Sequence, residues 1–600
     1  MIVRMKKITV VALESDQAAT LAALGRLGVL HLVAVREPAG PDLEKTSQEL
    51  ARARSALYKL DAVRSKQKPD AGKTVPHHDG IDVVRQIESL LARRKELEER
   101  EQTLIEEKAA IDPLGDFDPA QVRELGHQGI TLRLYRTADR RKPIAASEGA
   151  VIVILREDDG GRYFAVIGCG DVRAEAVEIP LPARRLADVK RELEAVKAEM
   201  AAVDRRIIEL SHAADAVAAL VERLEARLAF LLAREGAGRQ GALIWLQGFC
   251  PVDAVEAVRR AAHQHGWGLL VEEPSPGDQV PTLIRNPAWI RPIEPLFKVL
   301  KILPGYHEVD VSWSFLIFLS VFFAMIVGDA GYGLVFLGLT AWARRKWKTA
   351  APEPFRLLTL FSVTTITWGI LSGAYFGLEP LPAPLAALQA RLPTTAWLAD
   401  KQNTMSLCLF IGSVHLTLAH LWNALRMLNS SRAIAQLGWV GMVWSLFFAA
   451  RFLMFGTPLP DGYRWMLMAS LAAIVLFMTP VRQLKREWAN HLMLLLSIMS
   501  TFGDVLSYTR LYALGVAGFK VAAAFNTMAA GLASNRIWLA PVAALLLFAM
   551  HGFNILLSAM SVLVHGIRLN ALEFSMHLGL EWSGKPYRPF VVTETESSNS

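Results

Sequence analysis

A single arginine stands inside one of the apolar segments of the chain. Arg510 lies in the sequence FGDVLSYTRLYALGVAG, with apolar or weakly polar neighbours for more than a helical turn on each side. Charge at membrane depth is costly and is by default a functional hypothesis. Arg510 is therefore the first candidate for chemistry that involves ions. A structural alternative stays open, in which Arg510 pairs with Asp504 or Glu573 to hold helices together.

A stripe of polar residues follows the last long apolar segment. Spacings of three, four, three, four and three residues place its members on one face of a helix. The members are His551, Asn554, Ser558, Ser561, His565 and Arg568. Such a stripe can hydrate a path through the membrane or hydrogen-bond a neighbouring helix. Its coincidence with Arg510 favours the path, whereas Arg568 alone fits snorkelling to the interface equally well.

Other polar residues in apolar segments are weaker candidates. Asp329, in the sequence GDAGYG, is expected at the outer turn of a first helical hairpin. His415 and His420 are most simply hydrogen-bonded between helices. Arg451 and Lys520 fit anchors at the lipid interface. None of the five is predicted to take part in ion movement.

The sequence argues against catalysis and against cofactor, metal or nucleic-acid binding. Gly236, Gly238 and Gly241 form GxGxxG, but they follow a predicted helix and precede a strand, the reverse of the dinucleotide-binding context. No GxxxxGK[ST] motif occurs, so no nucleotide site and no catalytic residue is expected. The three cysteines are far apart and fit neither a disulfide framework nor a zinc site. The net charge of +7 comes from basic residues interleaved with acidic ones, as on solvated helices.

The candidate residues lie in a half of the chain that is composed for lipid. The apolar share is 52%, and residues 312 to 580 hold most of the Trp, Phe and Leu runs, whereas residues 1 to about 300 are dense in charge. We predict an all-α membrane domain over residues 312–580 with eight transmembrane helices. Their ranges are near 313–328, 329–343, 355–378, 403–425, 433–455, 464–481, 489–532 and 537–576.

The topology follows from basic clusters and segment lengths. The first two helices are expected to form a short hairpin broken at Gly328, Gly331 and Gly333, because the cluster from Arg344 to Lys348 then faces the cytoplasm. The N-terminal half and the C-terminus are placed in the cytoplasm on the same rule. About 40 helical residues would run roughly 60 Å against a hydrocarbon core of roughly 30 Å, so the last two segments should tilt steeply or project.

The first half is predicted to be an α/β arm of two lobes that an antiparallel coiled coil connects. Two strand–helix–strand patterns predict a proximal lobe, and strands near 130–136, 150–155 and 163–168 predict a distal one. The predicted domains are the proximal lobe at 1–40 and 236–300, the coiled coil at 41–112 and 183–235, the distal lobe at 113–182 and a cytoplasmic tail at 581–600.

A heptad seam is the clearest local pattern of the arm. Apolar residues alternate at spacings of three and four from Leu186 to Leu231, so one helix of roughly 70 Å is expected there. The partner side has apolar residues at Leu50, Leu57 and Leu60, a break near 66–80, and then apolar residues every seven positions from Val83 to Ile111. An antiparallel coiled coil within one chain accounts for both.

Several motifs together resemble the a/I subunit family of V-type and archaeal-type rotary ATPases, over nearly the whole chain. The most specific is SYTRLYALG, with its arginine. The motifs are GDAGYG (328–333), TWGILSGAYFG (367–377), GSVHLTLAHLWN (412–423), GDVLSYTRLYALGVAG (503–518) and HGIRLNALEF (565–574). The resemblance implies a non-catalytic stator subunit that forms ion half-channels and couples H⁺ or Na⁺ movement to ATP hydrolysis or synthesis.

The resemblance also implies residue roles and partners. Arg510 would face the rotor ring and Arg568 would support it. Apart from the resemblance, Asp504, Tyr508 and Glu573 are predicted as supporting residues of this site. The expected partners are the proteolipid ring, peripheral stalk subunits on both lobes, the central-stalk cap, the ATPase head and membrane lipid. The expected location is a prokaryotic inner or plasma membrane. The chain departs from the family pattern at two positions. It has Ser558 where many relatives carry a glutamate, and Gly518 where some carry a histidine.

Two rival classes stay open at this point. A secondary transporter would be expected to show an internal repeat and midplane carboxylates of its own, and neither is apparent. A membrane-anchored coiled-coil scaffold would need the arm, but it would have no use for Arg510 or for a polar stripe that ends at Arg568.

Overall fold

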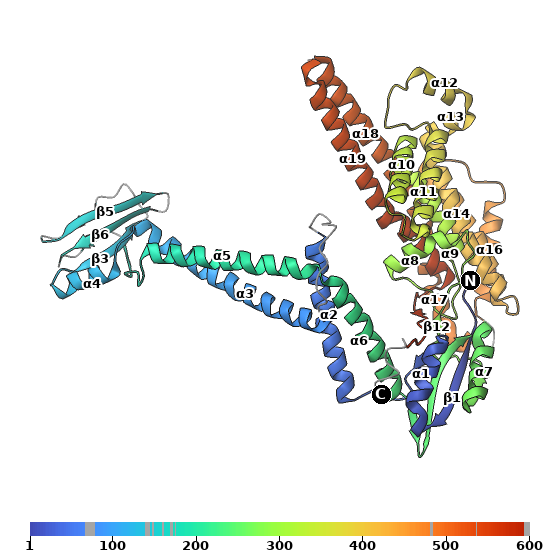
Figure 1. Cartoon of the computed structure of the whole chain (residues 1–600). Helices are drawn as coiled ribbons and strands as arrows, with labels where there is room; N and C mark the ends of the chain where they lie inside the picture. The colour runs from blue at the N-terminus through green and yellow to red at the C-terminus, as the bar shows by residue number, and fades with distance from the viewer. Residues whose placement is uncertain are drawn as a thin grey trace. The chain divides into compact units, whose positions relative to one another are not determined.

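A computed structural model describes residues 1–65, 79–137, 144–146, 149–158, 161–168, 172–173, 176–479, 484–535 and 537–592 (Figure 1). The chain divides into two compact units. One consists of Met1–Ile8, Phe249–Glu256 and Val271–Pro589, and the other of Thr9–Gly248, Ala257–Leu270 and Phe590–Ser600. The domain boundaries drawn from the sequence stay a prediction. Cys169 and residues 593–600 of the predicted tail lie outside the described residues.

A five-stranded sheet forms where the two strand–helix–strand patterns were predicted. Its strand order is β11-β1-β10-β2, with β9 paired antiparallel to β10. The chain contributes β1 (Met5–Leu13), α1 (Gln17–Leu27) and β2 (His31–Val33), and later β9 (Gly238–Gln240), β10 (Leu243–Pro251), α7 (Val255–His265) and β11 (Gly268–Glu272). Of the GxGxxG glycines, Gly236 ends a helix, Gly238 begins β9 and Gly241 lies in the turn after it, the predicted helix-to-strand context.

Four helices bury the heptad residues. They are α2 (Pro41–Arg64), α3 (Gly80–Ile111), α5 (Leu186–Ser211) and α6 (Ala214–Glu235). α3 packs along α5 and α2 along α6, and their shared core contains Leu60, Leu104, Val189 and Val217. Arg54 pairs with Glu225 at 2.7 Å and so joins α2 to α6. Because this pair is exposed, apolar burial rather than charge accounts for most of the stability.

The expectation of one unbroken helix from Leu186 to Leu231 is wrong. α5 ends at Ser211 and α6 begins at Ala214. The Ser211 hydroxyl donates to the carbonyl of Ile208, and the amide of Ala213 donates to the carbonyl of Leu210 at 2.9 Å. The amide of Ala213 thus closes an i→i+3 turn, and the Ser211 hydroxyl occupies the carbonyl of Ile208, which ends the helix without breaking the apolar periodicity.

A second sheet lies between α3 and α5 in the sequence. Its four strands are antiparallel, in the order β5-β6-β3-β8. They are β3 (Leu132–Thr137), β5 (Val151–Asp158), β6 (Gly161–Ile167) and β8 (Val177–Ile179), preceded by α4 (Pro119–His127) and accompanied by the pair β4 (Ala145–Ala146) and β7 (Val172–Arg173). Leu114, Leu134 and Ala165 form the core of this lobe.

The second half of the chain is almost entirely helical. Among the described residues, five helices are long and apolar enough to cross a membrane, or up to six if a bent pair counts as one span. Two short strands, β12 (Pro281–Thr282) and β13 (Lys585–Pro586), pair in parallel. The helices are α8 (Glu294–Leu300), α9 (Ser312–Val327), α10 (Ala330–Lys346), α11 (Pro352–Ser372), α12 (Ala383–Arg391), α13 (Pro393–Ala399), α14 (Lys401–Arg426), α15 (Arg432–Phe455), α16 (Tyr463–Phe477), α17 (Leu484–Ser507), α18 (Thr509–Asn535), α19 (Ala540–Ser561) and α20 (Ser575–Leu578).

The predicted hairpin break lies at Gly328, which separates α9 from α10, whereas Gly331 and Gly333 lie inside α10 and do not break it. The two helices are bent by 120° at this point. Gly328 ends α9 with a φ of 69°, a backbone conformation that costs glycine little. Buried Asp329 caps α10, because its Oδ1 accepts from the amides of Gly331 at 2.7 Å and Tyr332 at 3.2 Å. Its Oδ2 accepts from the amide of Gly377, so Asp329 joins the turn before α10 to the turn that follows α11.

The last two segments are as long as predicted. Apolar helical sequence runs from His491 to Ser534 over 44 residues and from Ala540 to Leu578 over 39. α18 and α19 pack against each other and run side by side (Figure 1). The first segment is divided at Tyr508 between α17 and α18, and the second changes its helical geometry after Ser561.

Candidate functional site

The two predicted arginines share one buried carboxylate. Arg510 Nη1 lies 3.4 Å from Glu573 Oε1, and Arg568 Nε lies 3.3 Å from the same oxygen. The Glu573 side chain is 4% exposed, whereas Arg510 is 34% and Arg568 51% exposed. One acid thus faces two bases, which leaves the group with a net positive charge. Of the two structural partners considered for Arg510, the structure selects Glu573 and not Asp504.

A change of helix type brings Arg568 to Glu573. After α19 the helix continues as two π-helical turns, at Val562–Gly566 and Leu569–Phe574. Residues five apart would diverge by about 140° around an α-helix, whereas i→i+5 bonding brings them close together. Ser575 shows the same spacing, because its hydroxyl donates to the carbonyl of Asn570 at 2.9 Å. The π-turns therefore bring Arg568 to the acid that Arg510 contacts from α18.

The guanidinium of Arg510 keeps donors for a further partner. Within the described residues, its hydrogen bond to Glu573 uses one N–H of Nη1. Arginine carries five N–H donors and stays charged at any working pH. The other carboxylate oxygen of Glu573, Oε2, is buried without a hydrogen-bond partner in the described part of the chain. The arginine can thus bind a second anionic group without losing the first.

Asp504 takes part in a separate polar chain. His577 Nε2 and Asp504 Oδ2 are 3.1 Å apart, and His577 Nδ1 and His420 Nε2 are 3.0 Å apart. His420 Nδ1 lies 2.8 Å from Gln436 Oε1. These hydrogen-bonded side chains connect α17, α20, α14 and α15. His420 was expected to be hydrogen-bonded between helices, and it is; sequence reasoning missed His577 and Gln436.

Tyr508 is a fully buried connection between helices. Its hydroxyl and His415 Nδ1 are 2.9 Å apart. The imidazole of His415 stacks between the rings of Phe318, at 3.8 Å between centroids, and Phe574, at 4.1 Å. Such close stacking fixes the ring in one orientation. Tyr508 and His415 therefore position the residues that precede Arg510.

The His551 end of the stripe meets a tyrosine that sequence reasoning missed. The Tyr332 hydroxyl lies 2.8 Å from His551 Nδ1 and accepts a hydrogen bond from Asn554 Nδ2 at 2.9 Å. Asn554 Nδ2 also lies within hydrogen-bond distance of the Gly518 carbonyl, at 2.8 Å. His551 Nε2 is 3.0 Å from Asn526 Oδ1. The only available signal for Tyr332 was its position in GDAGYG.

The remaining stripe residues are not joined to either group. Ser558 is buried opposite Gly518, where a Cβ at position 518 would lie 3.7 Å from the Ser558 hydroxyl. Ser561 and His565 are half-buried, and His565 Nδ1 is buried without a hydrogen-bond partner among the residues described. The stripe thus has one hydrogen-bonded group at His551 and one ion-paired group at Arg568. In the described chain, no hydrogen bond or ion pair connects these two groups.

The weaker candidates have structural contacts. Lys520 pairs with Glu379 at 3.1 Å in an exposed position. The guanidinium of Arg451 lies 5.7 Å from the ring centre of Phe447. Among the described residues, no group of three or more His, Cys, Asp or Glu side chains could hold a metal ion.

The chain is similar in sequence to known proteins over nearly its whole length. No family model matches the chain. V-type ATP synthase subunit I 1 of Treponema pallidum is 32% identical over 633 residues, which cover 98% of this chain and 100% of the relative. The chain belongs to the V-type ATP synthase subunit I family. This confirms the resemblance carried by the membrane motifs and decides against the transporter and scaffold alternatives.

Other relatives agree with this assignment. V-type ATP synthase subunit I of Borreliella burgdorferi is 27% identical, over 98% of this chain and 99% of the relative. A-type ATP synthase subunit I of Methanocaldococcus jannaschii is 24% identical, over 68% and 64%. A crystal structure of the cytoplasmic N-terminal domain of subunit I, homolog of subunit a, of V-ATPase matches 44% of this chain and 99% of that chain, at 16% identity and a TM-score of 0.20. The sequence relatives and the long apolar helices of the second half show that the chain is a membrane protein and a stator subunit of a rotary ATPase, as the sequence predicted.

Proposed function

We propose that Arg510 is the fixed charge that faces the ion-carrying carboxylate of a rotor ring. The observation that carries this proposal is the Arg510–Glu573–Arg568 group, in which one buried acid meets two bases. A guanidinium near a lipid-buried carboxylate favours its ionised form and so drives off the bound ion. The carrier carboxylate belongs to the ring, so this chain need not supply one.

The stripe supplies the two aqueous paths in this proposal. His551 and Asn554 lie toward one end, and His565 and Arg568 toward the other, with Arg510 facing from α18. An ion that enters along one part binds the ring carboxylate, rides the ring and leaves along the other part. The fixed positive charge prevents a direct crossing because a cation would have to pass a guanidinium in a medium of low dielectric constant.

Glu573 holds Arg510 in place without neutralising the site. A carboxylate matched to one arginine would compete with the ring for that arginine. Here Glu573 Oε1 is shared with Arg568, and both contacts are longer than the roughly 2.7–2.9 Å of strong charge-assisted bonds. The shared geometry keeps a net positive charge available to the ring carboxylate.

The proposal also covers the membrane spans, the arm, the cellular location and the partners. We propose eight spans, with α9 and α10 as two of them, and α16 as a short one. The helices α2, α3, α5 and α6 form the coiled-coil arm, and peripheral stalk subunits bind both lobes. The arm and the C-terminus lie in the cytoplasm of a prokaryotic cell. The central-stalk cap and the ATPase head reach this chain only through the assembled complex, and H⁺ or Na⁺ is the ion.

The direct test is ATP-driven ion uptake into vesicles that contain the assembled complex. Arg510→Gln removes the charge and keeps a polar side chain of similar length. We expect uptake to vanish while the subunits still co-purify in the wild-type ratio. Persistent uptake by an intact complex would mean that Arg510 is structural. Lys520→Gln, which removes an exposed cation from the same helix, is the matched control and should transport normally.

A further inference from the structure

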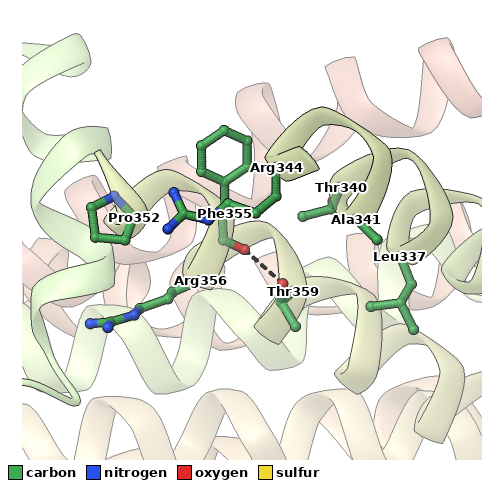
Figure 2. A pocket seen from close by; sticks show the side chains of 8 residues that line it. All are labelled: Leu337, Thr340, Ala341, Arg344, Pro352, Phe355, Arg356 and Thr359. Carbon is green, nitrogen blue, oxygen red and sulfur yellow. Dashed lines mark hydrogen bonds between the residues drawn. The ribbon is translucent and has the colours of Figure 1, made fainter. Parts of the chain in front are cut away.

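A groove between α10 and α11 is lined by two arginines and an apolar wall. It has a volume of about 490 Å³ and is open to the surface. Arg344 comes from the last turn of α10, and Arg356 from the start of α11. Figure 2 shows both guanidinium groups extending toward the end where Pro352 lies, while Leu337 lies at the opposite end. The groove is therefore amphiphilic along its length.

The charged end has an excess of positive charge that the chain does not neutralise. Residues 342–356 contain Arg344, Arg345, Lys346, Lys348 and Arg356, against one acid at position 353. None of these five bases forms an ion pair with a carboxylate among the residues that the structure describes. Arg344 instead donates to the carbonyl of Ala350 at 3.2 Å and lies 5.4 Å from the ring centre of Phe355. The guanidinium is thus oriented but not neutralised.

The apolar surroundings of the groove are those of a membrane interface. Trp342 and Trp347 are both exposed, and the Lys346 ammonium lies 5.0 Å and 5.6 Å from their ring centres. Exposed tryptophans beside lysines are typical of the level at which lipid headgroups lie. The basic cluster places this end of α10 on the cytoplasmic side.

We propose that this groove binds one anionic phospholipid, with its phosphate at Arg344 and Arg356 and an acyl chain along Leu337 and Ala341. Basic pockets between membrane helices on the cytoplasmic side suit such headgroups, and arginine forks match phosphate oxygens. The amino end of α11 adds a positive dipole end, although Pro352 and Pro354 carry no N–H. A free phosphate would leave the apolar wall in water, so the whole groove fits a lipid better.

The test uses the purified complex and a phosphatidylglycerol that carries a photoreactive diazirine in one acyl chain. Cross-linked peptides are mapped by mass spectrometry. We expect cross-links in α10 and α11 that unlabelled phosphatidylglycerol suppresses, and that phosphatidylcholine or millimolar inorganic phosphate leaves in place. Suppression by phosphate would indicate a free-anion site, and equal suppression by phosphatidylcholine would indicate an apolar groove without headgroup recognition; either overturns the proposal.

Variants separate the groove from its charged surroundings. A charge-assisted hydrogen bond to a bound phosphate contributes about tenfold to binding, so Arg344→Gln with Arg356→Gln should weaken phosphatidylglycerol binding about 100-fold. The control, Arg345→Gln with Lys348→Gln, removes the same charge from residues that do not line the groove and should weaken it less than about fivefold. Ala341→Phe narrows the apolar end, keeps every charge and should also reduce cross-linking. Equal losses in the first two variants, or no effect of Ala341→Phe, would refute a specific lipid-binding site in this groove.

Discussion

The shared carboxylate of Glu573 is the sharpest point at which the proposed mechanism can be perturbed. Glu573→Gln keeps the shape of the side chain and removes its charge. Arg510 and Arg568 then lose their common anion while every other contact of the three residues stays. If Glu573 positions Arg510, ion transport should fall but not vanish, because the essential charge is still present and only its placement is looser.

The expected size of the effect follows from exposure and distance. Removing one partner of a fully buried ion pair costs about 3–5 kcal/mol, whereas exposed pairs contribute about 0–1 kcal/mol. Glu573 is buried, but Arg510 is 34% and Arg568 51% exposed, and the contacts are 3.4 and 3.3 Å long. An intermediate value of about 1–2 kcal/mol corresponds to a roughly 5- to 30-fold reduction.

The assay is ATP-driven ion uptake by reconstituted complex, normalised to the rate of ATP hydrolysis. Single and double changes of Glu573 with Arg510 or Arg568 form two double-mutant cycles that show which arginine depends more on the acid. Glu379→Gln is the matched control, since Glu379 pairs with Lys520 in an exposed position. Its uptake should equal that of the wild type.

Two outcomes would refute the positioning role of Glu573. Wild-type uptake in Glu573→Gln would show that the carboxylate does not place Arg510. Complete loss with an intact complex, as in Arg510→Gln, would show that Glu573 carries the ion itself. In the second case the two double variants would be no worse than Glu573→Gln alone.

Two further predictions concern structure rather than transport. Asp329→Ala should lower the thermal stability of the complex more than Asp329→Asn, because asparagine keeps an acceptor that caps α10. Alanine leaves three backbone amides without acceptors, at a cost of about 1–3 kcal/mol each. Equal stability of the two variants would contradict the capping role. Burial raises the pKa of the Cys250 thiol to about 12, so its thiolate fraction at pH 8 is about a thousandfold lower than that of an exposed cysteine. Alkylation followed by peptide mass spectrometry should be correspondingly slow in the folded chain and fast after denaturation, and rapid labelling of the folded chain would contradict this burial.

Elements with strong sequence periodicity could be predicted from the sequence. The heptads identified buried residues such as Val189 and Val217, and the glycine at position 328 marked the turn between α9 and α10. The end of α5 could not be predicted, because a local i→i+3 turn at Ser211 leaves the apolar spacing unchanged. The partnership of His577 with Asp504 and His420 could not be predicted either, since it joins three helices that are distant in sequence.

The stripe shows most clearly where periodicity stops being informative. An α-helical period puts Arg568 in line with His551 and Asn554, and on that period Glu573 faces elsewhere. The π-turns from Val562 to Phe574 change this phase, and they are the reason that Arg568 and Glu573 meet. Sequence spacing gives the residue types, but a change of helix type is decided by packing around the segment. Such turns often occur at functional sites, where an extra residue in a helix re-aims the side chains beyond it. The positive group at Arg510 therefore depends on helix geometry as much as on the arginines themselves.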